Sequence, residues 1–495
     1  MRVRVVSTAS GKQAIQVVSK IHGALTVHKH IGSFANPLEK AQLLDQARVF
    51  IQESTGQTNL LDILSSSRLN DIAIIQSQPL LVYRLLTAVY DKLGLNKYPD
   101  PLIRDLVIAR IYRPASKRET REILFDLFGR RYSLKTVYRH LKTAIASGLE
   151  NSFQSVLIEF AKEEMSDSLR LVFYDVTTLY FESGIRTKLK DFGFSKDHRP
   201  SDTQVVIGLV VNRQGFPLYF DTFAGNTFEG HTLPTVIKNV RKLLGYPDDL
   251  VVVADAAMLS RDNLDLLNQR QIGFIVGARM GNLPALLLDR IANKLDRQDG
   301  QVTIVTYHHQ RLICQYSAKR AARDKSNREK QVVRAKKAIS TPSGVTNRFR
   351  FVKAVGQTYA LNAELVSKAE KLEGIKGYLT NTQFNETEVI NRYHDLWRVE
   401  NSFRLTKSDL EARPIFHRLD ETIKAHLAIV FAGLAVSRYI EIKTGMSIKK
   451  VLKLAQRVLT HKVTNSKTGE TTLIETEIKD AVLKKKIKLL KSLGH

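Results

Sequence analysis

The pattern of apolar and polar residues along the chain changes near residue 165. Residues 1 to 90 are mixed, with a short β-strand predicted at Arg2–Ser7 and helical spacing of apolar residues from Pro37 onward. Residues 100–165 have the spacing of helices throughout. We therefore predict a mostly helical N-terminal region over residues 1–165.

Two helices near the end of this region have a pattern of their own. Lys117–Phe128 has helical apolar spacing and precedes Gly129, while a second helix is predicted to begin at Ser133, a suitable N-cap. That second helix carries the basic residues Lys135 and Arg139. Helix, glycine-containing turn and basic helix over residues 117–146 form the outline of a helix-turn-helix that binds DNA. An ordinary helical hairpin with solvated charges fits the pattern equally well.

From Leu169 onward, β-branched and aromatic residues indicate strands. Strands are predicted at 169–181, 204–211, 216–223, 250–255 and 272–278, and helices at 231–244 and 261–270. Three antiparallel strands followed by two helix–strand units predict an α+β domain with a mixed five-stranded sheet and helices on both faces. This is the element order of the ribonuclease-H-like fold, in which the first and fourth strands are neighbours.

Residues 281–376 interrupt this order and are predicted to be an insertion. It contains the basic helix Lys319–Lys337, with nine Lys or Arg residues against two acids, between the strand-like segments 302–307 and 348–352. The main domain resumes at Tyr378, and a long helix is predicted from residues 386–388 onward. We therefore predict a central domain over residues 166–440 and a basic helical region over residues 441–495.

The charge of the chain points to a polyanionic partner. Its 495 residues carry a formal net charge of +27, with a pI of about 9.9. Lys and Arg side chains that neutralise phosphates release counterions, so this excess favours nucleic acid. Cys314 is the only cysteine, which excludes an intramolecular disulfide and a cysteine-based metal site. The start resembles no signal peptide and the longest apolar run, 427–436, is too short to span a membrane, so a cytoplasmic protein without a membrane partner is expected.

Two aspartates occupy positions where a carboxylate is costly. Asp175 lies inside the first apolar strand, and Asp255 ends the fourth. Neighbouring carboxylates repel each other, and divalent cations remove that repulsion. Two Mg²⁺ ions, for which Mn²⁺ can substitute, would suit these oxygen ligands and could activate an attacking oxygen and stabilise a leaving one. Either aspartate alone is explained as well by a structural acid, and the pattern does not select a third ligand among the downstream acids.

A family resemblance does select one. The segment Tyr393–Lys407 resembles the Tyr-Arg-Glu-Lys signature of one group of bacterial insertion-sequence DDE transposases, and the segments around Asp175 and Asp255 resemble that family's two aspartate strands. The resemblance implies that Glu400 is the third catalytic and metal-binding carboxylate. Tyr393, Glu400 and Lys407 are seven residues apart, so a single helix would carry them on one face. Leu396 occupies the signature's arginine position, and Arg398 or Arg404 would replace that arginine as a phosphate contact.

The resemblance further implies a function. It predicts a bacterial, nucleoid-associated enzyme that cuts the ends of its mobile element and joins them to target DNA by metal-dependent phosphoryl transfer. The related group passes through a hairpin end. Because both element ends must be held together, a homodimer assembled on double-stranded DNA is expected. Two alternatives stay open: a non-catalytic DNA-binding protein, either a regulator or a decayed transposase, and a ribonuclease-H-like nuclease without strand transfer.

Overall fold

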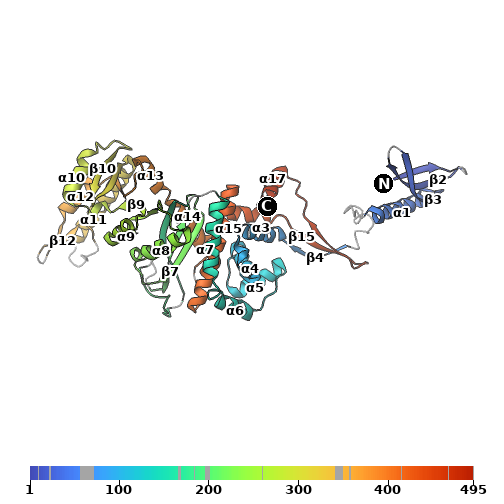
Figure 1. Cartoon of the computed structure of the whole chain (residues 1–495), viewed down its shortest axis with the longest axis horizontal. Coiled ribbons are helices and arrows are strands. Elements are labelled where there is room, and N and C mark those ends of the chain that lie inside the picture. The colour runs from blue at the N-terminus through green and yellow to red at the C-terminus, as the bar shows by residue number, and fades with distance from the viewer. Residues whose placement is uncertain are drawn as a thin grey trace. The chain divides into compact units, whose positions relative to one another are not determined.

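The structure, a computed structural model, describes residues 1–8, 11–21, 24–55, 72–165, 169–182, 184–194, 201–258, 260–340, 349–355, 358–413, 415–466 and 468–493. Two compact units make up the chain, both drawn in Figure 1. The first comprises Met1–Ser77 and Thr460–Glu475, and the second comprises Gln78–Leu459 and Thr476–His495.

The first unit holds two small sheets. One is the antiparallel sheet β1–β2–β3, against which helix α1 packs around Ile15, Val17, Phe34 and Ala47, and the other has the order β16–β15–β4. The elements are β1 (Arg2–Ser7), β2 (Gln13–Ile21), β3 (Ala24–Phe34), α1 (Pro37–Thr55), β4 (Ile72–Gln78), β15 (Thr460–Asn465) and β16 (Thr471–Glu475).

These sheets differ from the mostly helical N-terminal region and the helical C-terminal region expected from the sequence. Of the first three strands only β1 was predicted. Strand β3 is largely exposed, and its polar residues His28, Lys29 and His30 interrupt the apolar alternation that would have revealed it. The hairpin β15–β16 is mostly half-buried and rich in threonine, so it lacks a continuous apolar face that a pattern could detect.

The second unit begins with five helices and has the long helix α15 at the centre of its core. The helices of this part are α3 (Leu80–Lys92), α4 (Pro101–Tyr112), α5 (Lys117–Phe128), α6 (Leu134–Ala144), α7 (Leu149–Glu163), α15 (Asp420–Thr444), α16 (Ile448–Ala455) and α17 (Ala481–Ser492). By length and composition α15 could cross a membrane, but 89% of its most apolar stretch is buried inside the protein. It packs against α3, α4, α6 and α7 as a core helix.

A mixed sheet of eight strands forms the other half of this unit, in the order β10–β11–β14–β9–β8–β5–β6–β7. Its strands are β5 (Leu171–Tyr180), β6 (Gln204–Val211), β7 (Pro217–Ala224), β8 (Val251–Ala254), β9 (Gly273–Ala278), β10 (Val302–Tyr307), β11 (Gln310–Tyr316) and β14 (Ile375–Thr380). Strands β5, β8 and β9 are parallel to one another, and all other neighbouring pairs are antiparallel. The expected adjacency of the first and fourth strands is confirmed.

The expectation of five strands was wrong. Strand β9 has a second neighbour in β14, which pairs with it antiparallel and is followed by β11 and β10. Unpaired backbone groups at the edge of an otherwise buried sheet are costly, and residues 377–380 of β14, which follow the expected insertion, satisfy those of β9. Strands β11 and β10, which lie within the expected insertion, then extend the sheet. That insertion is therefore partly built into the main sheet. Its strand-like segment 348–352 begins outside the described residues. In the described part of this segment and just after it, the small hairpin of β12 (Val352–Val355) and β13 (Thr358–Leu361) is present.

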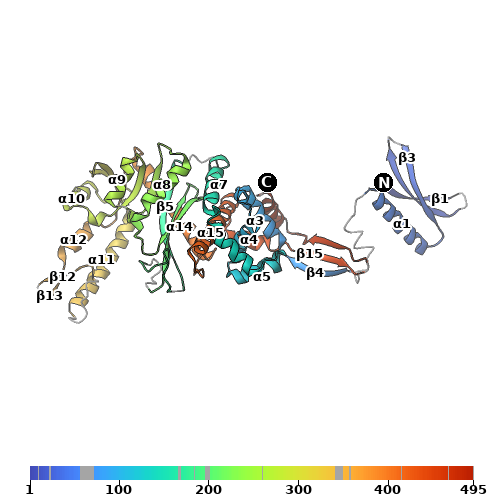
Figure 2. The same ribbon diagram turned by 60° about the horizontal axis from the view of Figure 1, so that its bottom comes forward.

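Helices cover both faces of the large sheet. The helices of this half are α8 (Leu233–Leu244), α9 (Arg261–Gln269), α10 (Ala285–Lys294), α11 (Ala318–Ile339), α12 (Ala363–Lys371), α13 (Glu386–His394) and α14 (Trp397–Ser408), of which α8, α9, α10, α13 and α14 contact the sheet. The Tyr174 hydroxyl of β5 hydrogen-bonds with the Thr232 hydroxyl just before α8, at 2.6 Å, so α8 covers one face. On the other face Thr177 and Leu179 line a small cavity with Phe403 and Thr406 of α14. Figure 1 shows α10–α12 around β10 at one end of this unit and α4–α6 at its other end, and Figure 2 shows α10–α12 and α4 at the same two ends.

Arg438 joins α15 to the turn between β6 and β7. It is only 7% exposed, and its guanidinium donates hydrogen bonds to the carbonyl oxygens of Gln214 and Gly215 at 3.0 and 3.2 Å. It also pairs with Glu441 at 2.8 Å. We expect Arg438→Leu to lower the free energy of unfolding by about 3 kcal/mol, because three acceptors lose a buried charged donor.

Urea unfolding followed by circular dichroism measures this loss. Lys443→Leu serves as the matched control, since Lys443 is an exposed cation on the same helix. If the two substitutions change the unfolding midpoint equally, Arg438 does not anchor the turn.

Candidate active site

Asp175 and Asp255 lie side by side on two neighbouring parallel strands. The register of β5 and β8 pairs residues from Leu171 with Val251 through Tyr174 with Ala254, so Asp175 and Asp255 are the next pair along. Neighbouring strands are about 4.8 Å apart, and paired residues of parallel strands point to the same face. Asp175 alternates with Thr177, so both aspartates point to the face covered by α13 and α14.

The two aspartates differ in their surroundings. Asp175 is half-buried in a strand whose other residues are almost all buried, whereas Asp255 follows the last residue of β8 and is exposed. Each carboxylate accepts a hydrogen bond at 2.7 Å from the backbone N–H of the next residue, Val176 and Ala256 respectively. These bonds help to fix the orientation of both carboxylates.

Tyr393 of α13 forms a hydrogen bond with Asp255. Its hydroxyl donates a hydrogen bond to the Asp255 carboxylate at 3.1 Å, and its ring is buried. Burial raises the pKa of the Tyr393 hydroxyl, and the negative charges of Asp255 and Glu400 raise it further, so the hydroxyl stays a donor. Gly277 of β9 makes room for it, since a Cβ at that position would lie 2.5 Å from the Tyr393 hydroxyl oxygen.

Glu400 is on a different helix from Tyr393, which corrects the single long helix expected from the sequence. Helix α13 ends at His394 and α14 begins at Trp397. Between them the backbone tightens, because the N–H groups of Leu396 and Val399 bond to the carbonyl three residues back. Tyr393 is consequently buried and Glu400 exposed, rather than both sharing one helical face.

Helix α14 nevertheless brings Glu400 to the face of the aspartates. This helix packs on β5 and β6, and Phe403, one turn after Glu400, contacts the cavity that Thr177 lines. The charges of Glu400 and Asp255 both act on Tyr393. Asp255 at the end of β8 and Glu400 on α14 thus both lie within electrostatic reach of Tyr393, on the face of the sheet to which Asp175 points.

Lys376 of β14 is a cation of this region that the sequence did not reveal. Its ammonium lies 4.4 Å from the centre of the Tyr393 ring. Burial and the charge of Arg320 lower its pKa, whereas the charges of Asp255 and Glu400 raise it. A lone lysine in a short strand has no sequence signature, so only the pairing of β14 with β9 identified it.

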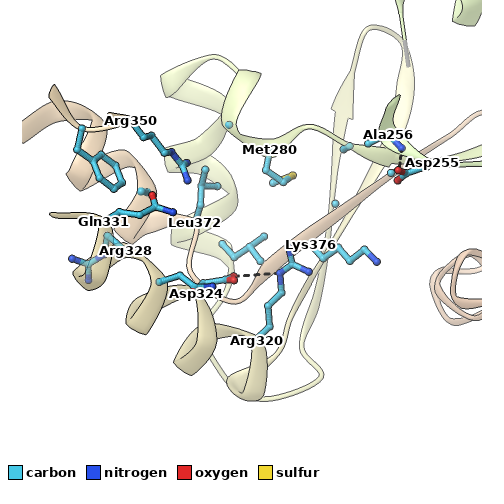
Figure 3. Close-up of a pocket in the computed structure, with 18 of the residues that line it drawn as sticks. Asp255, Ala256, Met280, Arg320, Asp324, Arg328, Gln331, Arg350, Leu372 and Lys376 are labelled. Carbon is cyan, nitrogen blue, oxygen red and sulfur yellow. Dashed lines mark hydrogen bonds and ion pairs between the residues drawn. The ribbon is translucent and has the colours of Figure 1, made fainter. Parts of the chain in front are cut away.

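A pocket with a volume of about 520 Å³ opens next to Asp255. Figure 3 shows Asp255 and Ala256 at one end, Gln331 and Arg350 at the other, and Lys376 between them. Its polar lining is mostly cationic, with Arg320, Arg328, Arg350 and Lys376 against the acids Asp255 and Asp324. Arg320 pairs with Asp324 at 3.3 Å, and Arg328 with Glu373 at 2.7 Å. The pocket therefore suits a negatively charged ligand that reaches the aspartates.

The donor set suits a hard divalent cation at the two aspartates. Carboxylate oxygens on adjacent strands are the ligands that Mg²⁺ and Mn²⁺ prefer. Within the described residues, however, no three His, Cys, Asp or Glu side chains lie close enough together to hold an ion. Asp175 and Asp255 are paired by the sheet, whereas Glu400 is exposed in the first turn of α14 and does not complete such a group. The expected convergence of all three carboxylates is thus only partly present in this structure.

The residues predicted to contact DNA are accessible except Tyr393. Arg398 pairs with Asp395 at 3.1 Å, and Arg404 donates to the Asn401 side chain at 2.6 Å. Lys407 lies in the last turn of the same helix and is partly exposed. Helices α5 and α6 have the bounds expected for residues 117–146, with Gly129 in the left-handed conformation between them. Lys135 and Arg139 are exposed on α6, and DNA binding by this pair of helices stays a prediction.

Comparison with known proteins places this region in a family. A family model described as "Transposase DDE domain" matches residues 170–435, which contain all three carboxylates. A solved structure described as a piggyBac transposase synaptic complex with hairpin DNA resembles the chain with 10% sequence identity and a TM-score of 0.40. The match covers 77% of this chain and 79% of that one, and a similarity this low establishes no common fold. A comparison with curated proteins found no match.

The close approach of Gly277 and Tyr393 can be tested by a pair of substitutions. In Gly277→Ala the new methyl group meets the Tyr393 hydroxyl oxygen, and we expect a loss of about 1–3 kcal/mol in the free energy of unfolding. Adding Tyr393→Phe removes that oxygen and leaves the ring carbon at 3.1 Å as the nearest atom of this side chain, so part of the loss should be recovered.

Urea unfolding of the two single variants and the double variant gives the coupling energy. Gly281→Ala is the control, because a Cβ there meets no atom within 4 Å. Equal stability of Gly277→Ala and Gly281→Ala would contradict the close contact.

Proposed function

Because the chain belongs to the family of transposases with a DDE domain, we propose that it excises a mobile DNA element and inserts it elsewhere by metal-dependent phosphoryl transfer. One observation carries the proposal: the register of β5 and β8 pairs Tyr174 with Ala254, so Asp175 and Asp255 are the next residues along the two neighbouring strands, on the face of the sheet that α13 and α14 cover. The central strands run in the order β7–β6–β5–β8–β9, which is compatible with the ribonuclease-H-like fold. Transposases of this family generally use divalent metal ions.

In this proposal Asp175, Asp255 and Glu400 hold the cations. When bound, divalent ions supply activation of the attacking oxygen and stabilisation of the leaving one. A shift of α14 towards the sheet would bring Glu400 to the two aspartates. The Tyr393 hydroxyl holds the Asp255 carboxylate in a fixed orientation through its hydrogen bond. Lys376 compensates the negative charge of Asp255 and Glu400 and lines the pocket that a DNA phosphate would enter.

Two successive phosphoryl transfers would complete the reaction. In the first, a water oxygen bonds to the phosphorus at the element end, the bond from phosphorus to the 3′ oxygen breaks, and that oxygen takes up a proton. In the second, the freed 3′ hydroxyl loses its proton and bonds to a phosphorus of target DNA, whose own 3′ oxygen leaves. Because two ends must be joined together, we propose that a homodimer assembles on the DNA.

Basic residues on two surfaces would bind the DNA backbone. Arg404 and Lys407 lie on α14 beside the carboxylates, and Lys135 and Arg139 are on α6. In the Tyr-Arg-Glu-Lys group that the sequence resembles, Tyr393 would add a contact, but here its hydroxyl binds Asp255. Arg398 is paired with Asp395, so Arg404 is the better candidate to replace the signature arginine at Leu396.

If the carboxylates are catalytic, substituting them should abolish DNA cleavage without abolishing DNA binding. Asp175→Asn, Asp255→Asn and Glu400→Gln each remove a charge that holds a divalent ion. We expect each to lower cleavage of a labelled element end by roughly 10³-fold, as the loss of several kcal/mol of transition-state stabilisation implies. End binding should be retained or strengthened, because a negative charge facing the DNA backbone has gone.

A gel assay with Mg²⁺ reports nicking, strand-transfer products and binding together. Asp265→Asn is the matched control, an exposed acid on α9 that should leave cleavage unchanged. Cleavage at the parental rate by all three variants would show that the chemistry lies elsewhere. Cleavage by the parent without strand transfer would instead identify a nuclease.

The basic residues predict a change in the salt dependence of binding. Arg404→Gln and Lys407→Gln should each reduce the slope of log K against log salt by about 0.9, the value for one lost phosphate contact. Lys242→Gln, an exposed lysine on α8, should leave the slope unchanged. Titrations of a fluorescent element end between low and physiological salt measure the slope, and an unaltered slope in the α14 variants would show that these side chains do not contact phosphate.

A further inference from the structure

A second pocket, separate from the carboxylates, lies among the N-terminal helices of the larger unit. It has a volume of about 470 Å³ and is bounded by the end of α4, the first turn of α5, Tyr138 of α6, the segment after α14 and His426 of α15. Its lining carries four Lys or Arg side chains, Arg110, Lys117, Arg118 and Arg413, and only two acids, Glu119 and Glu411.

Lys117 is the unusual member of this lining. Its side chain is only 6% exposed, and it has no hydrogen bond, ion pair or ring contact with any residue in the described part of the chain. Burial, and then the positive charge of Arg110, hold the pKa of Lys117 well below its usual range. A buried ammonium without a partner is costly, and lysine is rarely buried in this state.

Neighbouring groups increase the positive character of the pocket instead of neutralising Lys117. Arg110 is itself buried and donates to the backbone carbonyls of Ala115 and Glu411, at 3.1 and 3.5 Å, and not to a carboxylate. Of the two acids, Glu119 lies 4.0 Å from Arg113, outside the pocket lining. Glu411 is exposed.

Two histidines, His417 and His426, line the same pocket as Lys117. The ring of His426 is buried, with one nitrogen 3.3 Å from the Ala412 carbonyl oxygen and the other, Nδ1, without a hydrogen-bond partner among the residues that the structure describes. Its ring centre lies 5.2 Å from that of His417. Burial and the charges of Lys117 and Arg110 lower the pKa of both rings, that of His417 to about 3. An anion in the pocket would reverse these effects, since it would stabilise the protonated forms of both groups.

The first turn of α5 adds backbone donors. Ser116 is the N-cap, and its side chain accepts the Glu119 N–H at 3.2 Å. The other N–H groups of a first turn have no partner within the helix, and the helix dipole favours an anion at this end. Ser116, Lys117 and Arg118 all line the pocket. The backbone donors of this turn and the Lys117 side chain can therefore bind the same ligand.

We propose that this pocket binds a phosphate group, with Lys117, Arg118 and the first turn of α5 as its donors. A phosphate supplies the negative charge and the oxygen acceptors that Lys117 lacks. The group could belong to DNA or be free in solution. DNA is favoured because Tyr138 at the pocket lies between Lys135 and Arg139 on the exposed face of α6.

Thermal unfolding of the full chain in inorganic phosphate tests the site, with chloride at equal ionic strength as the reference. Phosphate should raise Tm in a saturable way, because a ligand that binds only the folded state stabilises it. Lys117→Met should weaken phosphate binding by at least roughly tenfold, the ratio expected from one lost charge-assisted hydrogen bond. Without phosphate it should melt no lower than the parent, because an unpartnered buried amine has gone.

Lys242→Met, on the surface of α8, should retain the full phosphate response. If Lys117→Met fails to fold, Arg118→Gln replaces it, because Arg118 is exposed and lines the same pocket. The proposal is overturned if phosphate raises Tm no more than chloride, or if neither pocket variant weakens the response.

A short DNA duplex added to the phosphate titration identifies the source of the group. If the duplex weakens phosphate binding in the parent but not in the pocket variant, the pocket binds a DNA phosphate. If the duplex leaves the phosphate affinity of the parent unchanged, the pocket binds free phosphate. Asp175→Asn should keep the parental phosphate response. The test of the catalytic carboxylates and the test of the phosphate pocket are therefore independent. Either proposal can be contradicted while the other holds.

Discussion

The parallel pairing of β5 with β8 is the constraint on which the site depends. Its register alone makes Asp175 and Asp255 neighbours, although eighty positions separate them in the chain. Both strands are buried along their length, so apolar packing on two faces prevents a slip of register that would turn one carboxylate away. The free energy of burying the apolar strands thus outweighs the repulsion between the two nearby carboxylates. A bound cation would reduce that repulsion.

The extension of the sheet through β14 gives the site its positive side. Because β14 pairs with β9 directly, Lys376 lies close to Tyr393 and within the electrostatic reach of Asp255 and Glu400. Helix α11 then lines the pocket with Arg320 and Arg328. Several basic residues therefore lie beside a small acidic centre. Such an arrangement attracts a polyanion while keeping acceptors for metal ions at the point of contact.

The three carboxylates are positioned by different kinds of element. Asp175 and Asp255 are held by strands, whereas Glu400 lies on a helix that begins just after a tightened segment of backbone at residues 395–399. A small movement of that helix is the simplest change that would complete a group of three carboxylates. Binding of cations would favour such a movement, since it would replace repulsion between the acids with attraction to the ions.

The sequence alone determined the central strands, their order and the two aspartates, because buried strands are continuous apolar runs in which a carboxylate stands out. It also indicated α5 and α6 through a cap, a glycine and apolar spacing. It could not reveal β3, whose exposed face mixes polar and apolar residues, or the extension to eight strands, which depends on pairing across a hundred positions. The roles of Lys376 and Lys117 were equally hidden. Lysine is common on surfaces, and only tertiary packing decides which lysine lies beside a carboxylate and which is buried without a partner.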